Sequence, residues 1–183
     1  MKKLNLISLS LLTMLFLVGC GGSSSSSSDT GTGYYVDSPV VGVDYTCGAQ
    51  QGRTSSNGKF IYEKDKGCTF SLAGVKLREV PASQLKDGGK VFENDAHVAR
   101  FLQSLDNDGE PKNGIFIHND VHDALPKALA ANGSGGKVPR GGTLDAVVAS
   151  LDNDVPIFRG RVRTEDEVKD HLDDTRDRYF PSR

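Results

Sequence analysis

A five-residue sequence that occurs twice in the second half of the chain constrains the fold more than any other feature. The letters SLDND stand at 104–108 and again at 150–154, forty-six positions later. Apolar residues around both copies follow the spacing of a helix with one apolar face. They are Val98, Phe101, Leu102 and Leu105 in the first copy and Leu144, Val147, Val148 and Leu151 in the second. A helix with a single apolar stripe cannot bury it alone, so we expect the two copies to pack together.

The similarity between the copies continues beyond SLDND. With one inserted residue, Val121 and Leu125 match Val168 and Leu172. Each copy is thus predicted to run from a helix through an acidic loop and a short extended segment to a second helix. The last helix has a clear predicted start, because Thr164 as the N-cap and Glu167 three residues later form a capping box.

The first half of the chain shows the alternation of apolar and polar residues that is typical of strands. Apolar side chains alternate at Val41, Val43 and Tyr45, and turns such as Asn57-Gly58 separate such runs. These patterns predict β structure from residue 34 to about residue 80.

Three short motifs in this β region stand at 40–45 (VVGVDY), 52–54 (GRT) and 57–62 (NGKFIY). Together they resemble carboxypeptidase-regulatory-like β-sandwich modules, which carry V-x-G-V, G-x-T and G-x-F-x-F/Y motifs. The resemblance covers about forty residues and implies a small, non-catalytic β module. The segment is short for a full sandwich, so an incomplete sheet stapled by a disulfide is an equally open alternative.

The first twenty residues indicate export. Lys2 and Lys3 precede an almost unbroken apolar run at 4–18, which is too short to span a bilayer comfortably. The run ends in Leu-Val-Gly-Cys, which resembles a bacterial lipobox. The resemblance implies a signal peptide at 1–19 and acyl chains on Cys20. It also implies transfer to the outer membrane, because Gly21 stands where an inner-membrane lipoprotein usually has Asp. We expect 20–33, rich in Gly and Ser, to form a flexible tether.

The two other cysteines are Cys47 and Cys68. An even pair in an exported protein predicts a disulfide. A metal site is a poorer interpretation because no His lies nearby, and the oxidising compartment disfavours a catalytic thiol.

The first SLDND copy opens a stretch rich in oxygen donors. Asp106, Asp108 and Glu110 lie at alternate positions, Asn113 follows, and Lys112 could contribute its carbonyl. Such oxygens can converge on calcium if the chain turns tightly, with carbonyls and waters completing the shell. Calcium loops of the EF-hand type use a Glu at position twelve that binds through both oxygens. This loop has no such Glu, and Asp120 or Asp123 from the following helix would take its place. The alternative is a solvated Asp/Gly turn that caps helices.

This stretch resembles the acidic loops of EF-hands, dockerins and thrombospondin type 3 repeats. The segment 100–115 also resembles a group of surface lipoproteins of marine Gram-negative bacteria, which share R-[FL]-L-Q-S-L-D-x-D-G-x-P-x-N-G-I. That resemblance implies a fold and a cellular location, and it implies no particular activity. The second copy keeps Asp152 and Asp154 but loses the glycine, so we expect a degenerate, metal-free loop.

His118 and His122 lie at i, i+4, a spacing that can hold zinc. A protease motif would need Glu beside the first His, but Asn119 is there, so surface histidines at a helix start are favoured. The sequence also lacks the nucleophile motif G-x-S-x-G. We therefore expect no enzyme activity, with a zinc-dependent or other envelope hydrolase as the alternative.

Charge and composition complete the predictions. The chain has 22 Lys and Arg against 24 Asp and Glu, a balance that does not favour nucleic acid. The predicted fold class is α+β, with a disulfide-stapled β module at 34–90 and the two-copy helix–acidic loop–helix repeat at 91–183. The predicted function is a calcium-binding lipoprotein of the outer membrane, facing the periplasm or the cell surface. We expect it to bind or adhere to an envelope protein or glycan.

Overall fold

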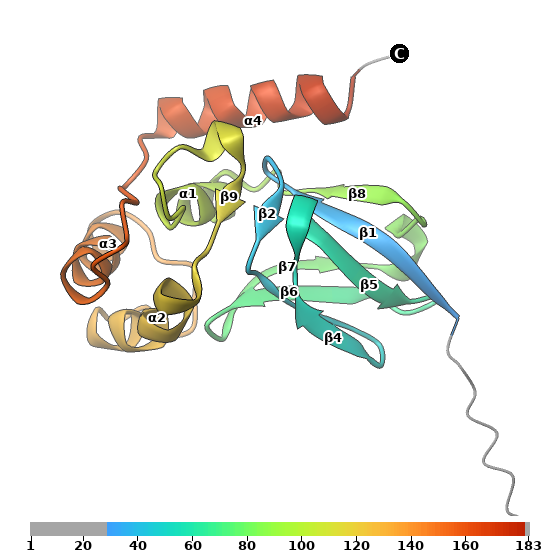
Figure 1. The fold of residues 1–183 in the computed structure, drawn as a ribbon, viewed down its shortest axis with the longest axis horizontal. Coiled ribbons are helices and arrows are strands. Elements are labelled where there is room, and N and C mark those ends of the chain that lie inside the picture. The colour runs from blue at the N-terminus through green and yellow to red at the C-terminus, as the bar shows by residue number, and fades with distance from the viewer. Residues whose placement is uncertain (1–28, 182–183) are drawn as a thin grey trace, which may run out of the picture.

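The structure is a computed structural model that describes residues 29–181. The predicted signal peptide at 1–19 and the predicted lipidation site Cys20 lie outside these residues. Within 29–181, none of the helices combines the length and the apolar character that a membrane crossing requires. The described chain has a mixed α/β fold with several sheets and four helices, as shown in Figure 1.

A three-stranded sheet begins the fold. Its central strand is β1 (Thr30–Val36), which pairs antiparallel with β5 (Lys59–Glu63) and parallel with β8 (Gly89–Phe92). The strand begins four residues before the predicted start of the β module at 34, so the assignment of 30–33 to the tether was wrong. A Cβ on Gly31 would lie 2.4 Å from Cζ of Tyr62, and one on Gly33 would lie 2.3 Å from Cζ of Phe60. These glycines therefore make room for aromatic rings within a strand.

A second sheet has the strand order β4-β3-β6-β7. Its strands are β3 (Asp44–Cys47), β4 (Gln50–Arg53), β6 (Cys68–Leu72) and β7 (Val75–Val80). Aromatic rings fill the space between the two sheets. Tyr35 stacks on Phe70 with ring centroids 4.4 Å apart, and Phe60 meets Phe70 edge-on at 4.9 Å. Such pairs add to the stability that comes from burying their area.

The predicted disulfide between Cys47 and Cys68 is confirmed. Thr46 pairs with Thr69 across β3 and β6, and the two cysteines occupy the next opposed positions along these antiparallel strands. The bridge therefore joins neighbouring strands at the edge of the aromatic core.

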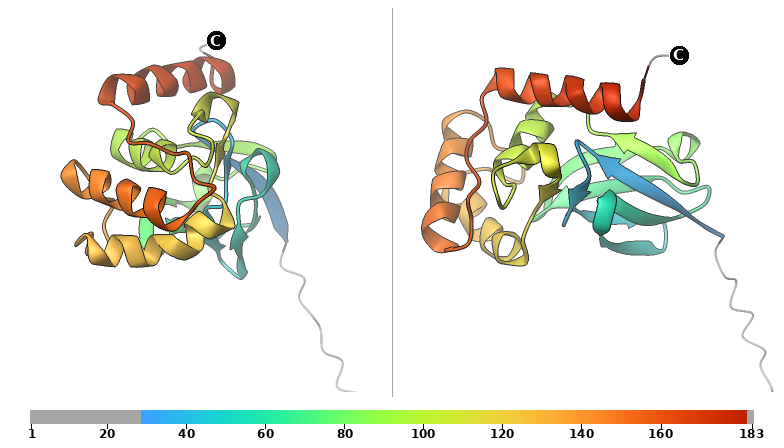
Figure 2. Two further views of the ribbon diagram at one scale, coloured as in Figure 1. Left: turned by 60° about the vertical axis from the view of Figure 1, so that its left-hand side comes forward. Right: turned by 45° about the horizontal axis from the view of Figure 1, so that its top comes forward.

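The second half of the described chain contains the four helices. They are α1 (Ala96–Ser104), α2 (Asn119–Ala131), α3 (Gly142–Asp154) and α4 (Glu165–Tyr179). Helix α1 packs against α4, and α2 packs against α3, as the views in Figure 2 show. The predicted capping box is confirmed, because Thr164 and Glu167 exchange both hydrogen bonds at the start of α4. Three short 3-10 turns occur at Ser56–Gly58, Ala82–Gln84 and Pro111–Asn113.

The prediction of an acidic loop in the second SLDND copy was wrong. The second SLDND copy is not a loop, because Asp152 and Asp154 belong to the last turns of α3. Helix α3 ends at Asp154, two residues before Pro156, and Val155 is extended as a residue before proline should be. Both aspartates are exposed.

The two halves of the molecule share one hydrophobic core. Strand β2 (Val40–Val41) comes from the β half and pairs in parallel with β9 (Ile115–Phe116) from the helical half. Helix α4 is the exception, because its buried apolar residues form a separate small cluster. That cluster contains Ala99, Val168 and Leu172, with Phe92 packed against it.

Candidate functional site

The acidic loop 106–113 lies between the end of α1 and strand β9. Its first carboxylate, Asp106, is only 1% exposed. One oxygen, Oδ1, accepts the N–H of Phe116 at 2.9 Å. The other oxygen, Oδ2, is buried and has no hydrogen-bond partner among the described residues. A buried polar atom without a partner is costly, so this oxygen is an unfilled acceptor position.

Asp108 organises the rest of the loop. Its Oδ1 accepts the N–H of Glu110 at 2.9 Å, and its Oδ2 accepts the side-chain amide of Asn113 at 3.0 Å. Gly109 lies between Asp108 and Glu110 and has φ +73°. A Cβ on Gly109 would come 2.7 Å from the carbonyl oxygen of Arg159. Only glycine fits this tight turn, so the loop is built around Asp108 and Gly109.

The two aspartates influence each other's ionisation. The pKa of Asp106 is raised to about 7, chiefly by burial, and the Asp108 carboxylate adds to the rise while the N–H of Phe116 opposes it. The pKa of Asp108 is lowered by hydrogen bonds from Asn113 and from the N–H of Glu110. The loop thus holds a buried carboxyl beside an exposed, readily ionised one.

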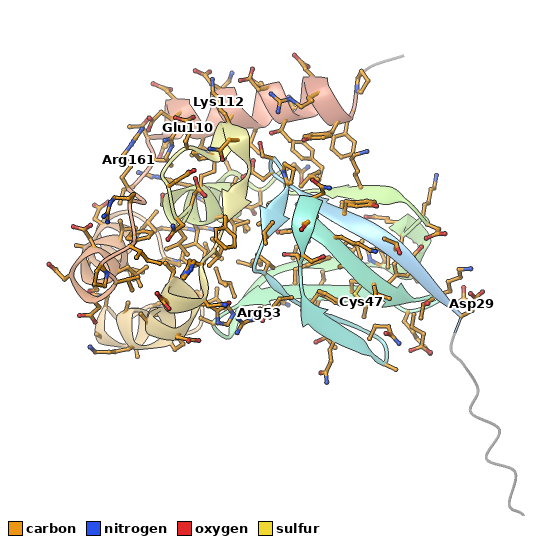
Figure 3. All side chains as sticks on the ribbon, in the orientation of Figure 1. Asp29, Cys47, Arg53, Glu110, Lys112 and Arg161 are labelled. Atoms are coloured by element: carbon orange, nitrogen blue, oxygen red, sulfur yellow. A yellow bond between two sulfur atoms is a disulfide. The ribbon has the colours of Figure 1, made fainter. Side chains whose placement is uncertain are left out.

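The other predicted calcium ligands are paired with other residues or exposed. The Lys112 ammonium is 3.5 Å from Asp174 of α4, and the Asp120 carboxylate is 3.5 Å from His118 on α2. Asp123 is exposed on α2, and Glu110 is exposed in the loop. Figure 3 shows Glu110 and Lys112 close to α4, with Arg161 nearby. Among residues 29–181, no three His, Cys, Asp or Glu side chains are grouped as they would be around a metal ion.

The histidine pair is engaged in structural contacts. His118 is the N-cap of α2 and accepts the N–H of Asp120, which is the predicted role at a helix start. His122 lies between two partners, with Nε2 3.0 Å from Asp44 and Nδ1 2.9 Å from Arg53. Arg53 thus links β4 to α2, as its position in Figure 3 shows.

Sequence reasoning missed two buried polar clusters. In the first, Arg78 makes a bidentate pair with Glu93, at 2.9 and 2.8 Å, and the Tyr35 hydroxyl donates to the same carboxylate. Glu93 is fully buried, and this pair ties β7 to the end of β8. No local sequence pattern indicates it, because its members are far apart in the chain.

The second buried cluster surrounds Asp37, which follows β1 and is fully buried. Gln103 of α1 donates to its Oδ2 at 3.0 Å, and Nε2 of His171 on α4 is 3.3 Å from its Oδ1. Burial raises the pKa of Asp37 to about 8 and lowers that of His171. Asp37 therefore contacts helices α1 and α4 together.

Three arginines alternate in the chain before α4, at positions 159, 161 and 163. No strand forms between residues 155 and 163, so their alternation does not place them on one face. Arg161 pairs with Glu167, and Arg163 is buried, 3.6 Å from the same carboxylate. Both guanidinium groups thus lie beside Glu167 in the first turn of α4.

Comparisons of the chain with models of known protein families, with curated proteins and with solved structures find no match. The resemblances named in the sequence analysis therefore stay predictions.

Proposed function

We propose that this chain is a lipid-anchored protein of the bacterial outer membrane, a non-catalytic binding module with a structural calcium ion in its acidic loop. The Cys47–Cys68 disulfide supports an oxidising compartment. Cys20, the proposed anchor, precedes Thr30 of β1 by ten positions. Asp29, where the described chain begins, lies at the end of the β half away from the helices (Figure 3). A membrane anchor at that end would leave the helical half accessible to an envelope protein or glycan.

The observation that carries the calcium proposal is the unpartnered Oδ2 of Asp106. It is a buried carboxylate oxygen, and it belongs to the residue that begins the loop. A cation beside it would compensate a buried negative charge that the described residues leave unpaired.

The proposed ligands are fewer than the sequence pattern allows. Asp106, Asp108 and the side-chain oxygen of Asn113 supply oxygens from the loop itself, and loop carbonyls and water would complete the shell. Glu110, Lys112, Asp120 and Asp123 are not needed in this arrangement. Two carboxylates without a bidentate Glu favour a weak site, with a Kd of about 10⁻⁴–10⁻³ M, as in extracellular modules.

The calcium proposal predicts a specific change in thermal stability. Calcium at about tenfold above Kd should raise the free energy of unfolding by about 1.4 kcal/mol, because it binds only the folded state. The melting temperature of the purified mature chain should therefore rise with millimolar calcium. Equal magnesium should have little effect, because it keeps its waters and demands octahedral geometry.

Paired variants make this test site-specific. Asp106→Ala with Asp108→Ala should abolish the calcium-dependent rise. Asp152→Ala with Asp154→Ala removes the same charge from the other SLDND copy and should leave the rise intact. A wild-type melting temperature that ignores millimolar calcium would show that the loop is only a turn.

The anchor has its own test. Acyl labelling should mark the wild-type chain and not Cys20→Ala, and the variant should leave the membrane fraction. A Cys20→Ala protein that still fractionates with membranes would contradict the proposed anchor. Protease treatment of intact cells would then distinguish the cell surface from the periplasm.

We also propose that the two helix–extended–helix segments form one paired unit. Segments 96–131 and 142–179 each contain two helices joined by a non-helical stretch, although only the stretch of the first segment contains a strand, β9. The first helix of one segment packs against the second helix of the other, in both directions. The two SLDND copies, one in a loop and one in a helix, would then have diverged within a shared arrangement of helices.

A further inference from the structure

A cleft of about 750 Å³ lies between β7, the start of α1 and the loop that joins α2 to α3. This basic cleft is lined by four side chains that carry or can carry positive charge. They are Lys76 from β7, His97 from α1, and Lys137 and Arg140 from the α2–α3 loop. Its volume is in the range of ordinary small-molecule sites.

The positive charge of the basic cleft is largely uncompensated. The cleft contains one acidic side chain, Asp95, whose Oδ1 already accepts the N–H groups of His97 and Val98 at the start of α1. Lys76 is paired with Glu79 at 2.9 Å. Neither Lys137 nor Arg140 has an ion-pair partner among the described residues. An anion entering the cleft would therefore meet two cations that nothing else in 29–181 neutralises.

The loop that presents these two cations is held in place. Ser134 is 91% buried, and its hydroxyl donates to the carbonyl of Lys137 at 2.6 Å. In return, the N–H of Lys137 donates to the carbonyl of Ser134 at 3.1 Å, and the N–H of Ser134 donates to that of Leu129. The backbone of Lys137 is thus fixed by the fold, which reduces the cost of ordering this loop on binding.

Gly142, the first residue of α3, has no role in the fold that would require a glycine. Its backbone is not left-handed, and a Cβ there would meet no atom within 4 Å. Glycine at a helical position is less stable than alanine. The absence of a side chain at Gly142 leaves the backbone at the start of α3 open to the close approach of a ligand. Gly142 lies in the chain between Arg140 and Thr143, which both line the cleft.

We infer that the basic cleft binds a small organic anion through a phosphate or carboxylate group. Lys137 and Arg140 would pair with the anionic group, since Arg and Lys are the usual partners of both chemistries. The Thr143 hydroxyl would add a hydrogen bond. The cleft also has apolar lining residues, which would contact the body of the ligand rather than its charge; they are Leu77, Val98, Val138 and Pro139. This inference does not depend on calcium or on the acidic loop.

The test is titration calorimetry on the full mature chain at low ionic strength. Four probes separate the possible anions: inorganic phosphate, glucose 1-phosphate, glucuronate and uncharged glucose. We expect glucose 1-phosphate or glucuronate to bind with a Kd at or below about 1 mM, and the tighter of the two identifies the anionic group. Glucose should not bind, and the affinity for the anions should fall as salt is added.

Three variants test the assignment to this cleft. Lys137→Gln with Arg140→Gln should weaken binding at least about tenfold, because two charge-assisted contacts are lost. Lys59→Gln with Lys86→Gln removes the same charge from exposed positions outside the cleft and should leave the affinity unchanged. Gly142→Ala should weaken binding while keeping or raising the melting temperature, because alanine favours the helix.

The proposal is overturned by any of three results. These are no binding of either organic anion at about 10 mM, equal binding of glucose, or unchanged affinity in the Lys137→Gln, Arg140→Gln variant. Because Gly142→Ala introduces no contact within 4 Å, its effect on binding cannot be attributed to misfolding.

Discussion

The two SLDND segments have the same five residues and different structures. At 104–108 the helix ends at Ser104, and the aspartates enter a loop in which Asp106 is 1% exposed. At 150–154 the helix continues to Asp154, and both aspartates are exposed. The serines behave alike, since each hydroxyl donates to the carbonyl four residues earlier. The difference therefore arises after the serine, in what the following chain offers.

The structure of each segment depends on whether a strand is available to pair with it. In the first, Asp106 accepts the N–H of Phe116, and the N–H of Asn107 donates to the carbonyl of the same residue. Pairing with β9 thus draws the chain out of the helix. In the second, such pairing is absent from the described contacts, and α3 continues until Pro156 requires an extended residue before it. The comparison teaches that an identical sequence takes the structure its tertiary contacts favour.

The largest expected effect concerns what the two segments share. Leu105 and Leu151 are both fully buried, so Leu105→Ala and Leu151→Ala should each lower the free energy of unfolding by about 2–5 kcal/mol. Urea unfolding measures both losses. Ile157→Ala, at a side chain that is 42% exposed, is the control and should cost much less. A small loss at only one leucine would break the proposed pairing of the two segments.

The next effect concerns Asp37, which contacts the helices α1 and α4. In the unfolded chain this carboxyl loses its proton near pH 4, whereas in the folded protein it keeps the proton up to about pH 8. The folded state therefore binds more protons in this window and loses stability as the pH rises through it, by at most about 1.4 kcal/mol per pH unit.

Asp37→Asn isolates this contribution. The pKa of His171 is about 6.5 in the unfolded chain and is lowered in the folded protein by burial, so His171 is largely neutral in both states about one pH unit higher, and unfolding is best compared between about pH 7.5 and 8.5. The asparagine keeps the shape and cannot titrate, so its stability should fall less steeply than that of the wild type. Parallel curves would show that Asp37 is already ionised in the folded protein.

A third prediction sharpens the difference between the two segments. Asp106→Ala removes the acceptor of the Phe116 N–H and should cost about 1–3 kcal/mol. Asp152→Ala, at an exposed helical position, should change the free energy of unfolding by no more than about 0.5 kcal/mol. Chemical denaturation with millimolar calcium present compares the two. Equal losses would mean that the buried position of Asp106 makes no energetic difference.

The smallest expected effect compares the starts of the two second helices. Helix α4 begins with the full capping box of Thr164 and Glu167, whereas α2 begins with a single bond to the side chain of His118. Thr164→Ala should lower the free energy of unfolding by about 1 kcal/mol. His118→Ala should cost less, and thermal unfolding near neutral pH measures both. The reverse order would indicate that His118 has a further contact role.

Several local features were predictable because their causes are local. The capping box of α4 depends on two residues three positions apart, and the apolar stripes of the helices follow from residue spacing. The disulfide pairing followed from the number of cysteines and from the predicted export. The start of β1 was missed because Gly31 and Gly33 have the composition of a linker, and only the rings of Phe60 and Tyr62 show why a strand needs glycines there.

The sequence by itself determined the elements whose stability comes from neighbours in the chain: the helical stripes, the α4 cap and the cysteine pair. Only the tertiary structure decided which SLDND copy became a loop, because the choice depends on the hydrogen bonds that join Asp106 and Asn107 to Phe116, about ten positions further along the chain. It also decided the burial of Asp37 between β1, α1 and α4, and the meeting of Lys76 with Lys137 and Arg140 around one cleft. Side chains so distant in sequence interact only after the chain has folded, so no local pattern could have brought them together.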